Sequence, residues 1–202
     1  MEVGKSRSER SDATRLALIG SARRLFGTSS YSEVSLAEIV EASGVTKGAL
    51  YHHFPGGKDE IAAETIRWSG AMYALLLPAV FDPAPDFVTG VRDFYALAAV
   101  HLRESGWEDA CPIATVALEV ASTNEPLRIA TAEVFDSWID AATARGVREG
   151  LPEPEARRLG IAIIVALEGA FVLCRSLRST EPLDVAGSIM VRAVQDSLTA
   201  HT

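Results

Sequence analysis

Cysteine and histidine are scarce in this sequence of 202 residues, which has two cysteines, Cys111 and Cys174, and four histidines. Two cysteines cannot build a disulfide framework, and the histidines are too scattered for the ligand spacing of a zinc site. Long apolar runs are also missing, since in the second half of the chain the uncharged stretch 159–167 is far shorter than the roughly 20 residues of a membrane span. We expect a cytoplasmic protein with no metal, no cofactor and no membrane segment.

The basic excess that is typical of nucleic-acid-binding proteins is absent, because the net charge is −8. The charge is unevenly distributed along the chain. Residues 1–60 hold eight Lys or Arg and eight Asp or Glu, whereas residues 61–202 hold eleven and nineteen. A neutral N-terminal domain can still bind DNA if its basic side chains and helix N-termini share one face.

Strand patterns are lacking, and apolar residues recur at helical spacing through most of the chain. We therefore predict an all-α fold of about nine helices that follows a mobile polar arm, residues 1–10. Ser11 or Asp12 is the expected cap of the first helix. The helices are expected at about 12–27, 35–42, 46–53, 58–77, 85–104, 112–122, 126–149, 153–177 and 182–199.

Residues 35–54 predict a helix-turn-helix motif. Ser35 and Glu38 have the spacing of a capping box, in which each side chain accepts a backbone N–H at the start of a helix. Gly44 ends that helix, and Thr46 caps the next one. Two short helices joined in this way pack on a third, which places a DNA-binding domain at 12–71 and a second helical domain at 72–202.

The second helix of this motif presents a hydrophilic face. Val45, Leu50 and Phe54 are spaced to turn into the core, so the opposite side can enter a major groove about 12 Å wide. The residues on that side are Thr46, Lys47, Gly48, Tyr51 and His52. Two alternatives stay open: Gly48 is an ordinary surface residue, and Tyr51 packs under the helix with only its hydroxyl exposed.

These motifs resemble the N-terminal domain of the tetracycline-repressor (TetR) family. The resemblance is carried by Leu18-Ile19, Ala22, Leu25-Phe26, Tyr31, Ile39, residues 43–54 (SGVTKGALYHHF) and residues 58–61 (KDEI). Residues 55–58 (PGGK) and 111–114 (CPIA) are similar to the LmrA/YxaF-like subgroup. The resemblance implies a dimeric, all-helical repressor that a small ligand releases from its operator.

The resemblance also implies roles for single residues. It places Thr46, Lys47, Gly48 and His52 at or near base edges, and it places Ser35, Tyr51 and Lys58 at phosphates. The residue types agree with these roles, because the two lysines supply positive charge. The N-termini of the second and fourth helices can also donate N–H groups to phosphate oxygens.

The second domain has a surplus of aromatic residues that suits a cavity for an apolar ligand. The expected lining residues are Trp68, Met72, Phe94, Tyr95, Trp107, Phe135, Trp138 and Phe171. The alternative is a plain hydrophobic core, because aromatic residues dominate cores as well. Glu119, His101 and Glu168 lie in apolar stretches, where each could meet a ligand or form an internal salt bridge.

The last two helices carry more apolar surface than a monomer is expected to bury, which predicts a homodimer through a four-helix interface. The expected interface residues are Leu159, Ile163, Leu167, Ala170, Cys174, Val191, Val194 and Leu198. Cys174 is expected to be a packing residue rather than a redox switch.

These features favour a sequence-specific DNA-binding regulator, a repressor that a small apolar effector releases from a palindromic double-stranded operator. We expect the effector to move the helix at 58–77 and so change the spacing of the two recognition helices. A second hypothesis is an α-helical enzyme, although the sequence shows no nucleophile–base pair, metal set or phosphate loop. A third is an interaction protein that uses the helix-turn-helix only for docking.

Overall fold

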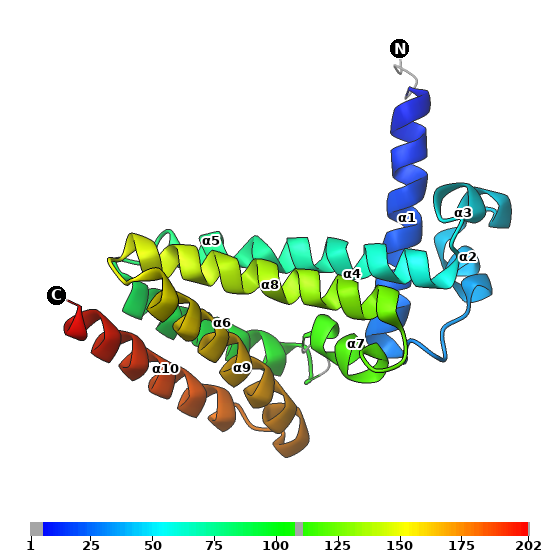
Figure 1. Cartoon of the computed structure of the whole chain (residues 1–202). Coiled ribbons are helices and arrows are strands. Elements are labelled where there is room, and N and C mark those ends of the chain that lie inside the picture. The colour runs from blue at the N-terminus through cyan, green and yellow to red at the C-terminus, as the bar shows by residue number, and fades with distance from the viewer. Residues whose placement is uncertain (1–5, 108–110, 202) are drawn as a thin grey trace, which may run out of the picture. The chain divides into compact units, whose positions relative to one another are not determined.

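The computed structural model describes residues 6–107 and 111–201, and within these ranges it contains ten α-helices and no strand (Figure 1). The predicted all-α fold is therefore confirmed. The helices are α1 (Arg7–Thr28), α2 (Leu36–Ser43), α3 (Lys47–His53), α4 (Lys58–Ala74), α5 (Leu76–Phe81), α6 (Phe87–Glu104), α7 (Pro112–Val120), α8 (Glu125–Arg148), α9 (Glu153–Leu177) and α10 (Glu181–Ala200).

The helix that the sequence analysis did not anticipate is α5, which arises at Pro78. Proline has no N–H to donate to the carbonyl four residues earlier, and its ring clashes with that carbonyl. The residue four before Pro78 is Ala74, where α4 ends, so the single helix expected at 58–77 is divided. Pro78 is the third residue of α5. The first four N–H groups of a helix have no acceptor within the helix, so a proline at this position loses no hydrogen bond.

The first helix begins earlier than expected. Ser6 caps α1, because its hydroxyl accepts the N–H of Glu9 at 3.2 Å and the Glu9 carboxylate accepts the N–H of Ser6. The expectation of a mobile arm over residues 1–10 is thus wrong for 7–10, and residues 1–5 lie outside the described residues. The expected cap at Ser11 or Asp12 is also wrong, because both residues lie inside α1.

The chain divides into two compact units. Unit 1 contains residues up to Gly70 together with 112–134, and unit 2 contains 71–111 and residues from Phe135 onward. This division differs from the one expected at residue 71, because α7 and the start of α8 group with the N-terminal helices. The core of unit 1 is formed by Leu18, Ile19, Ala22, Val34, Ile39, Leu50, Phe54 and Ile61.

In unit 2, α10 packs against both α6 and α9 (Figure 1). The approach of α10 to α6 is close, since a Cβ atom placed on Gly187 would lie 2.8 Å from the Cβ of Tyr95. The Tyr95 hydroxyl donates a hydrogen bond to the carbonyl of Ile163 on α9, at 2.8 Å. These contacts join the three helices around one apolar core.

Among the described residues, α9 is the helix that is long and apolar enough to cross a membrane by length and composition alone. Its buried residues include Leu159, Ile163, Leu167 and Cys174, which all belong to the core of unit 2. A core helix can match a membrane span in length and composition, so the apolar character of α9 is weak evidence for a membrane segment.

Candidate functional site

The first candidate site is the solvent-facing side of α3. The five residues predicted for this side, Thr46, Lys47, Gly48, Tyr51 and His52, are all exposed. On the opposite side, Leu50 and Phe54 are buried in the core of unit 1, and Val45 packs against it. Tyr51 is 45% exposed, so its ring is available to a partner rather than packed under the helix.

The chain segments around α3 are held by local hydrogen bonds. The predicted capping box of α2 is confirmed, because the Ser35 hydroxyl accepts the Glu38 N–H at 3.3 Å and the Glu38 carboxylate accepts the Ser35 N–H at 2.7 Å. Gly44 ends α2 with φ of +66°, a conformation that glycine adopts without steric cost. The Thr46 hydroxyl then accepts the Ala49 N–H at 3.2 Å and starts α3.

The Ser35 hydroxyl also donates a hydrogen bond to the Glu38 carboxylate at 2.7 Å. That donor is therefore engaged within the protein. The two hydrogen bonds from Ser35 hold the pKa of Glu38 below its usual value, so this carboxylate is charged at neutral pH. A phosphate contact from Ser35 requires its hydroxyl to leave Glu38.

Lys58, at the start of α4, packs against the turn between α1 and α2. Its Nζ lies 4.4 Å from the centroid of the Tyr31 ring, a cation–π geometry, and donates to the Ser32 carbonyl at 3.3 Å. An ammonium group has three donors, so Lys58 retains donors for a phosphate oxygen. The Tyr31 hydroxyl donates to Asp59, and burial together with this hydrogen bond raises the pKa of Tyr31.

The turn between α1 and α2 is also bound by α7, a link that the sequence analysis did not find. The Glu119 carboxylate accepts the backbone N–H groups of Tyr31 at 2.8 Å and Ser32 at 2.9 Å. The Asn124 side chain donates to Asp59 at 3.0 Å. The main partners of Glu119 are therefore two backbone N–H groups of this turn, one on each carboxylate oxygen, rather than a salt bridge.

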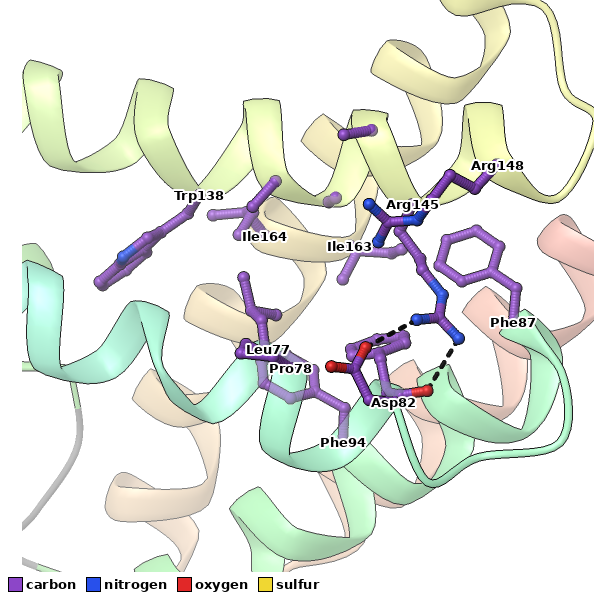
Figure 2. Close-up of a pocket in the computed structure, with 14 residues that line it drawn as sticks. Leu77, Pro78, Asp82, Phe87, Phe94, Trp138, Arg145, Arg148, Ile163 and Ile164 are labelled. Atoms are coloured by element: carbon purple, nitrogen blue, oxygen red, sulfur yellow. Dashed lines mark hydrogen bonds and ion pairs between the residues drawn. The ribbon is translucent and has the colours of Figure 1, made fainter.

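The second candidate site is a cavity of about 170 Å³ in unit 2 (Figure 2). Its walls come from α5, α6, α8 and α9. The lining residues are Leu77, Pro78, Phe81, Asp82, Phe87, Phe94, Trp138, Ala141, Ala142, Ala144, Arg145, Arg148, Ile163 and Ile164. The cavity is mostly apolar, and its charged residues are two arginines and one aspartate.

Two of the eight predicted pocket residues, Phe94 and Trp138, line this cavity. Phe135 and Tyr73 pack edge-on against Trp138, with ring centroids 5.7 and 6.3 Å away. The other predicted residues lie elsewhere. Trp68 packs on the core of unit 1, Met72 is exposed, Tyr95 is buried in the core of unit 2, and Trp107 and Phe171 pack on that core.

The charged residues of the cavity, Asp82, Arg145 and Arg148, are among those that sequence reasoning missed. Arg145 donates to the Asp82 carboxylate at 3.0 Å and to the Phe81 carbonyl at 2.8 Å. Helical spacing places Arg145 and Arg148 three residues apart near the end of α8, which is the one signal that could have paired them.

The predicted dimer residues lie mostly in the interior of one protomer. Two of them, Val191 and Leu198, pack against the core of unit 2. The other six are buried in that core: Leu159, Ile163, Leu167, Ala170, Cys174 and Val194. Their own protomer covers most of their surface, which leaves little of it for a second copy. The apolar residues that α9 and α10 expose are instead Ile161, Val165, Val172, Leu173, Leu177, Val185 and Ile189.

Comparisons with known proteins match both parts of the chain. Residues 18–65 match the profile described as bacterial regulatory proteins of the tetR family, and residues 88–189 match the profile of the C-terminal domain of LmrA/YxaF-like transcriptional regulators. An uncharacterised HTH-type transcriptional regulator of Bacillus subtilis, YxaF, is 34% identical over 171 residues, which cover 84% of this chain and 89% of YxaF. The transcriptional regulator LmrA of the same organism is 27% identical over 172 residues, 84% of this chain and 90% of LmrA.

Solved structures show the same fold. A TetR transcriptional regulator from Chloroflexus aurantiacus superposes with a TM-score of 0.76 at 26% identity, covering 92% of this chain and 96% of that one. The regulator CifR, solved with a 26-bp double-strand operator DNA, has a TM-score of 0.72 at 21% identity, covering 96% of this chain and 99% of that one.

Proposed function

Because this chain belongs to the TetR family of DNA-binding transcriptional regulators, we propose that it is a repressor that binds a palindromic operator as a homodimer and leaves it when a small apolar ligand binds. The relatives it matches are regulators. The proposal therefore assigns no catalytic step to the chain, and it places the protein in the cytoplasm with its DNA.

The observation that carries the proposal is the exposed side of α3. This side can present four groups to base edges in a major groove. They are the hydroxyl of Thr46, the cation of Lys47, the open backbone of Gly48 and the imidazole of His52. A Cβ atom on Gly48 would meet nothing within 4 Å, so the protein itself imposes no need for glycine there. We assign Gly48 to close approach of DNA.

Phosphate contacts are assigned to Ser35 at the start of α2, Tyr51 on α3 and Lys58 at the start of α4. Such contacts fix the register of a protein on DNA and supply most of the salt-dependent affinity. The rest of the chain is acidic, so these local groups must provide the attraction.

Dimerisation is assigned to the exposed apolar residues of α9 and α10. Val165 and Val172 are 66% and 56% exposed and lie seven residues apart, on one side of α9. Val185 and Ile189 lie four residues apart on α10 and are also about half exposed. An apolar stripe on two adjacent helices suits a second copy of the same chain, because a two-fold axis pairs each stripe with itself and matches a palindromic operator.

The test is a DNA shift assay with the purified protein and the DNA upstream of its own gene. We expect a sequence-selective shift that weakens as salt is raised, and we expect the combined Lys47→Ala and Tyr51→Ala variant to lose it. Arg103→Ala, which removes an exposed cation from α6 in unit 2, is the matched control and should shift DNA like the parent protein. A selective shift that survives in the double variant would overturn the assignment of α3.

A further inference from the structure

The two ends of the cavity in unit 2 differ in chemistry. Figure 2 shows Trp138 and Leu77 toward one end and the guanidinium groups of Arg145 and Arg148 at the other. The charged residues of the lining are two arginines against one aspartate, Asp82. A ligand in this cavity therefore meets an apolar wall along most of its length and the guanidinium groups of Arg145 and Arg148 at one end.

The single negative charge of the lining is already neutralised. Asp82 accepts a hydrogen bond from Arg145 Nη1 at 3.0 Å, and Arg145 Nη2 donates to the Phe81 carbonyl. Arg145 Nε lies 3.4 Å from a Glu149 carboxylate oxygen, yet it is buried and has no hydrogen-bond acceptor within the described ranges. A buried donor without an acceptor is costly, so the Nε of Arg145 is a weak point of this network.

Arg148 is the free cation of the site. Its guanidinium lines the cavity, and within residues 6–107 and 111–201 the structure shows no ion pair or hydrogen bond from it. Arginine offers five donors in a planar fork that matches a carboxylate. A cationic ligand would be repelled here by two guanidinium groups.

The size of the cavity limits the ligand to a small molecule. The volume of about 170 Å³ is close to that of a cavity of about 150 Å³ that binds benzene, and it lies below the range of about 300–1,000 Å³ typical of drug-sized ligands. Phe94, Phe81 and Trp138 supply aromatic walls for one ring.

We propose that the effector of this protein is a monocyclic carboxylic acid, bound with its ring between the aromatic walls and its carboxylate at Arg148 and Arg145. The inference rests on the proposed function in one respect, the role of the cavity as the effector site. It narrows the small apolar ligand of that proposal to an anion with an apolar body.

The test is isothermal titration of the full chain, without DNA, with benzoate and with benzamide, its neutral counterpart of the same shape. We expect benzoate to bind about tenfold more tightly, because a hydrogen bond to a charged group contributes more than one between neutral groups. Arg148→Gln should remove that preference by weakening benzoate about tenfold while leaving benzamide unchanged. Arg103→Gln, the same change of charge on the exposed side of α6, should leave both affinities unchanged.

A second variant tests the location. Ala141 is an exposed residue of the cavity lining, so Ala141→Trp should block the opening without disturbing the core, and it should weaken both probes. Equal affinities of the parent protein for benzoate and benzamide would overturn the inference, as would equal effects of Arg148→Gln and Arg103→Gln or unchanged binding in Ala141→Trp. Arg148-dependent binding of benzoate that fails to release DNA would support the ligand class and refute only the effector role.

Discussion

The carboxylate of Glu119 on α7 accepts the backbone N–H of Tyr31, with 2.8 Å between Tyr31 N and Glu119 Oε2. The second carboxylate oxygen accepts the Ser32 N–H, so one side chain satisfies two donors of the turn that precedes α2. The two segments are 88 residues apart in sequence. Within unit 1, Glu119 therefore ties α7 to the turn from which the helix-turn-helix begins.

We predict that Glu119→Ala lowers the free energy of unfolding by about 1–2 kcal/mol, because two turn N–H groups lose a charged acceptor at a partly exposed site. Glu119→Gln keeps one acceptor oxygen and should lose roughly half as much. Urea denaturation of the three proteins measures the difference. Parent-like stability of both variants would show that water replaces the carboxylate at no cost.

Acid should weaken the link between α9 and α10. Hydrogen bonds from Arg158 and then from Ser197, on α10, lower the pKa of Glu155 from its ordinary value of 4.5 to about 2. Because the pKa of Glu155 is lower in the folded state than in the unfolded state, its charged form stabilises the fold above a pH of about 4.3. This stabilisation is lost as the pH falls toward 2. We expect the melting temperature of the parent to exceed that of Glu155→Gln at pH 6, and we expect the gap to shrink by pH 3.

Ser197→Ala isolates the α10 partner of Glu155 in the same experiment. It removes one donor and should reproduce part of the gap at pH 6. A gap between parent and Glu155→Gln that stays constant from pH 6 to pH 3 would contradict the charged state assigned to Glu155.

The dimer surface proposed on α9 and α10 predicts that Val165→Glu produces a folded monomer. A carboxylate in an apolar interface is left buried and unpaired when two copies meet, which costs several kcal/mol. Leu97→Glu places the same charge on an exposed site of α6 and should remain a dimer. Sedimentation gives the mass of each protein, and a dimeric Val165→Glu protein would refute this surface.

The proposed release mechanism predicts that effector binding changes the distance between the two helix-turn-helix motifs of the dimer. Glu41, exposed on α2 and off the α3 face, is a suitable label site as Glu41→Cys, since Cys111 and Cys174 are both buried. With operator DNA, the motifs should match half-sites about 34 Å apart or a multiple of that distance. Spin-label distances that are the same with DNA and with effector would exclude the mechanism.

The helix-turn-helix could be predicted from sequence because its signals are local. Each signal involves residues no more than four positions apart: the Ser35 and Glu38 pair, Gly44, and Thr46. The structure contains each of these caps. Ser6 and Glu9 form the same kind of box, which shows that the signal at the start of α1 was present and was missed.

The second half could not be predicted to the same depth because its organisation depends on tertiary packing. Both sides of α9 are apolar, so periodicity does not reveal that Leu167 faces the core of its own protomer whereas Val165 faces solvent. Aromatic content does not separate a cavity wall from a core residue such as Tyr95. The approach of Arg148 to the cavity depends on the packing of four helices, which no local pattern encodes.

The salt dependence of operator affinity tests whether α3 is the DNA-binding surface. The slope of log affinity against log salt reports how many phosphate charges the protein neutralises. We predict that Lys47→Ala weakens binding and lowers this slope by about one, whereas Arg103→Ala leaves affinity and slope unchanged. Equal slopes and affinities for the parent and Lys47→Ala would show that α3 does not contact DNA through Lys47.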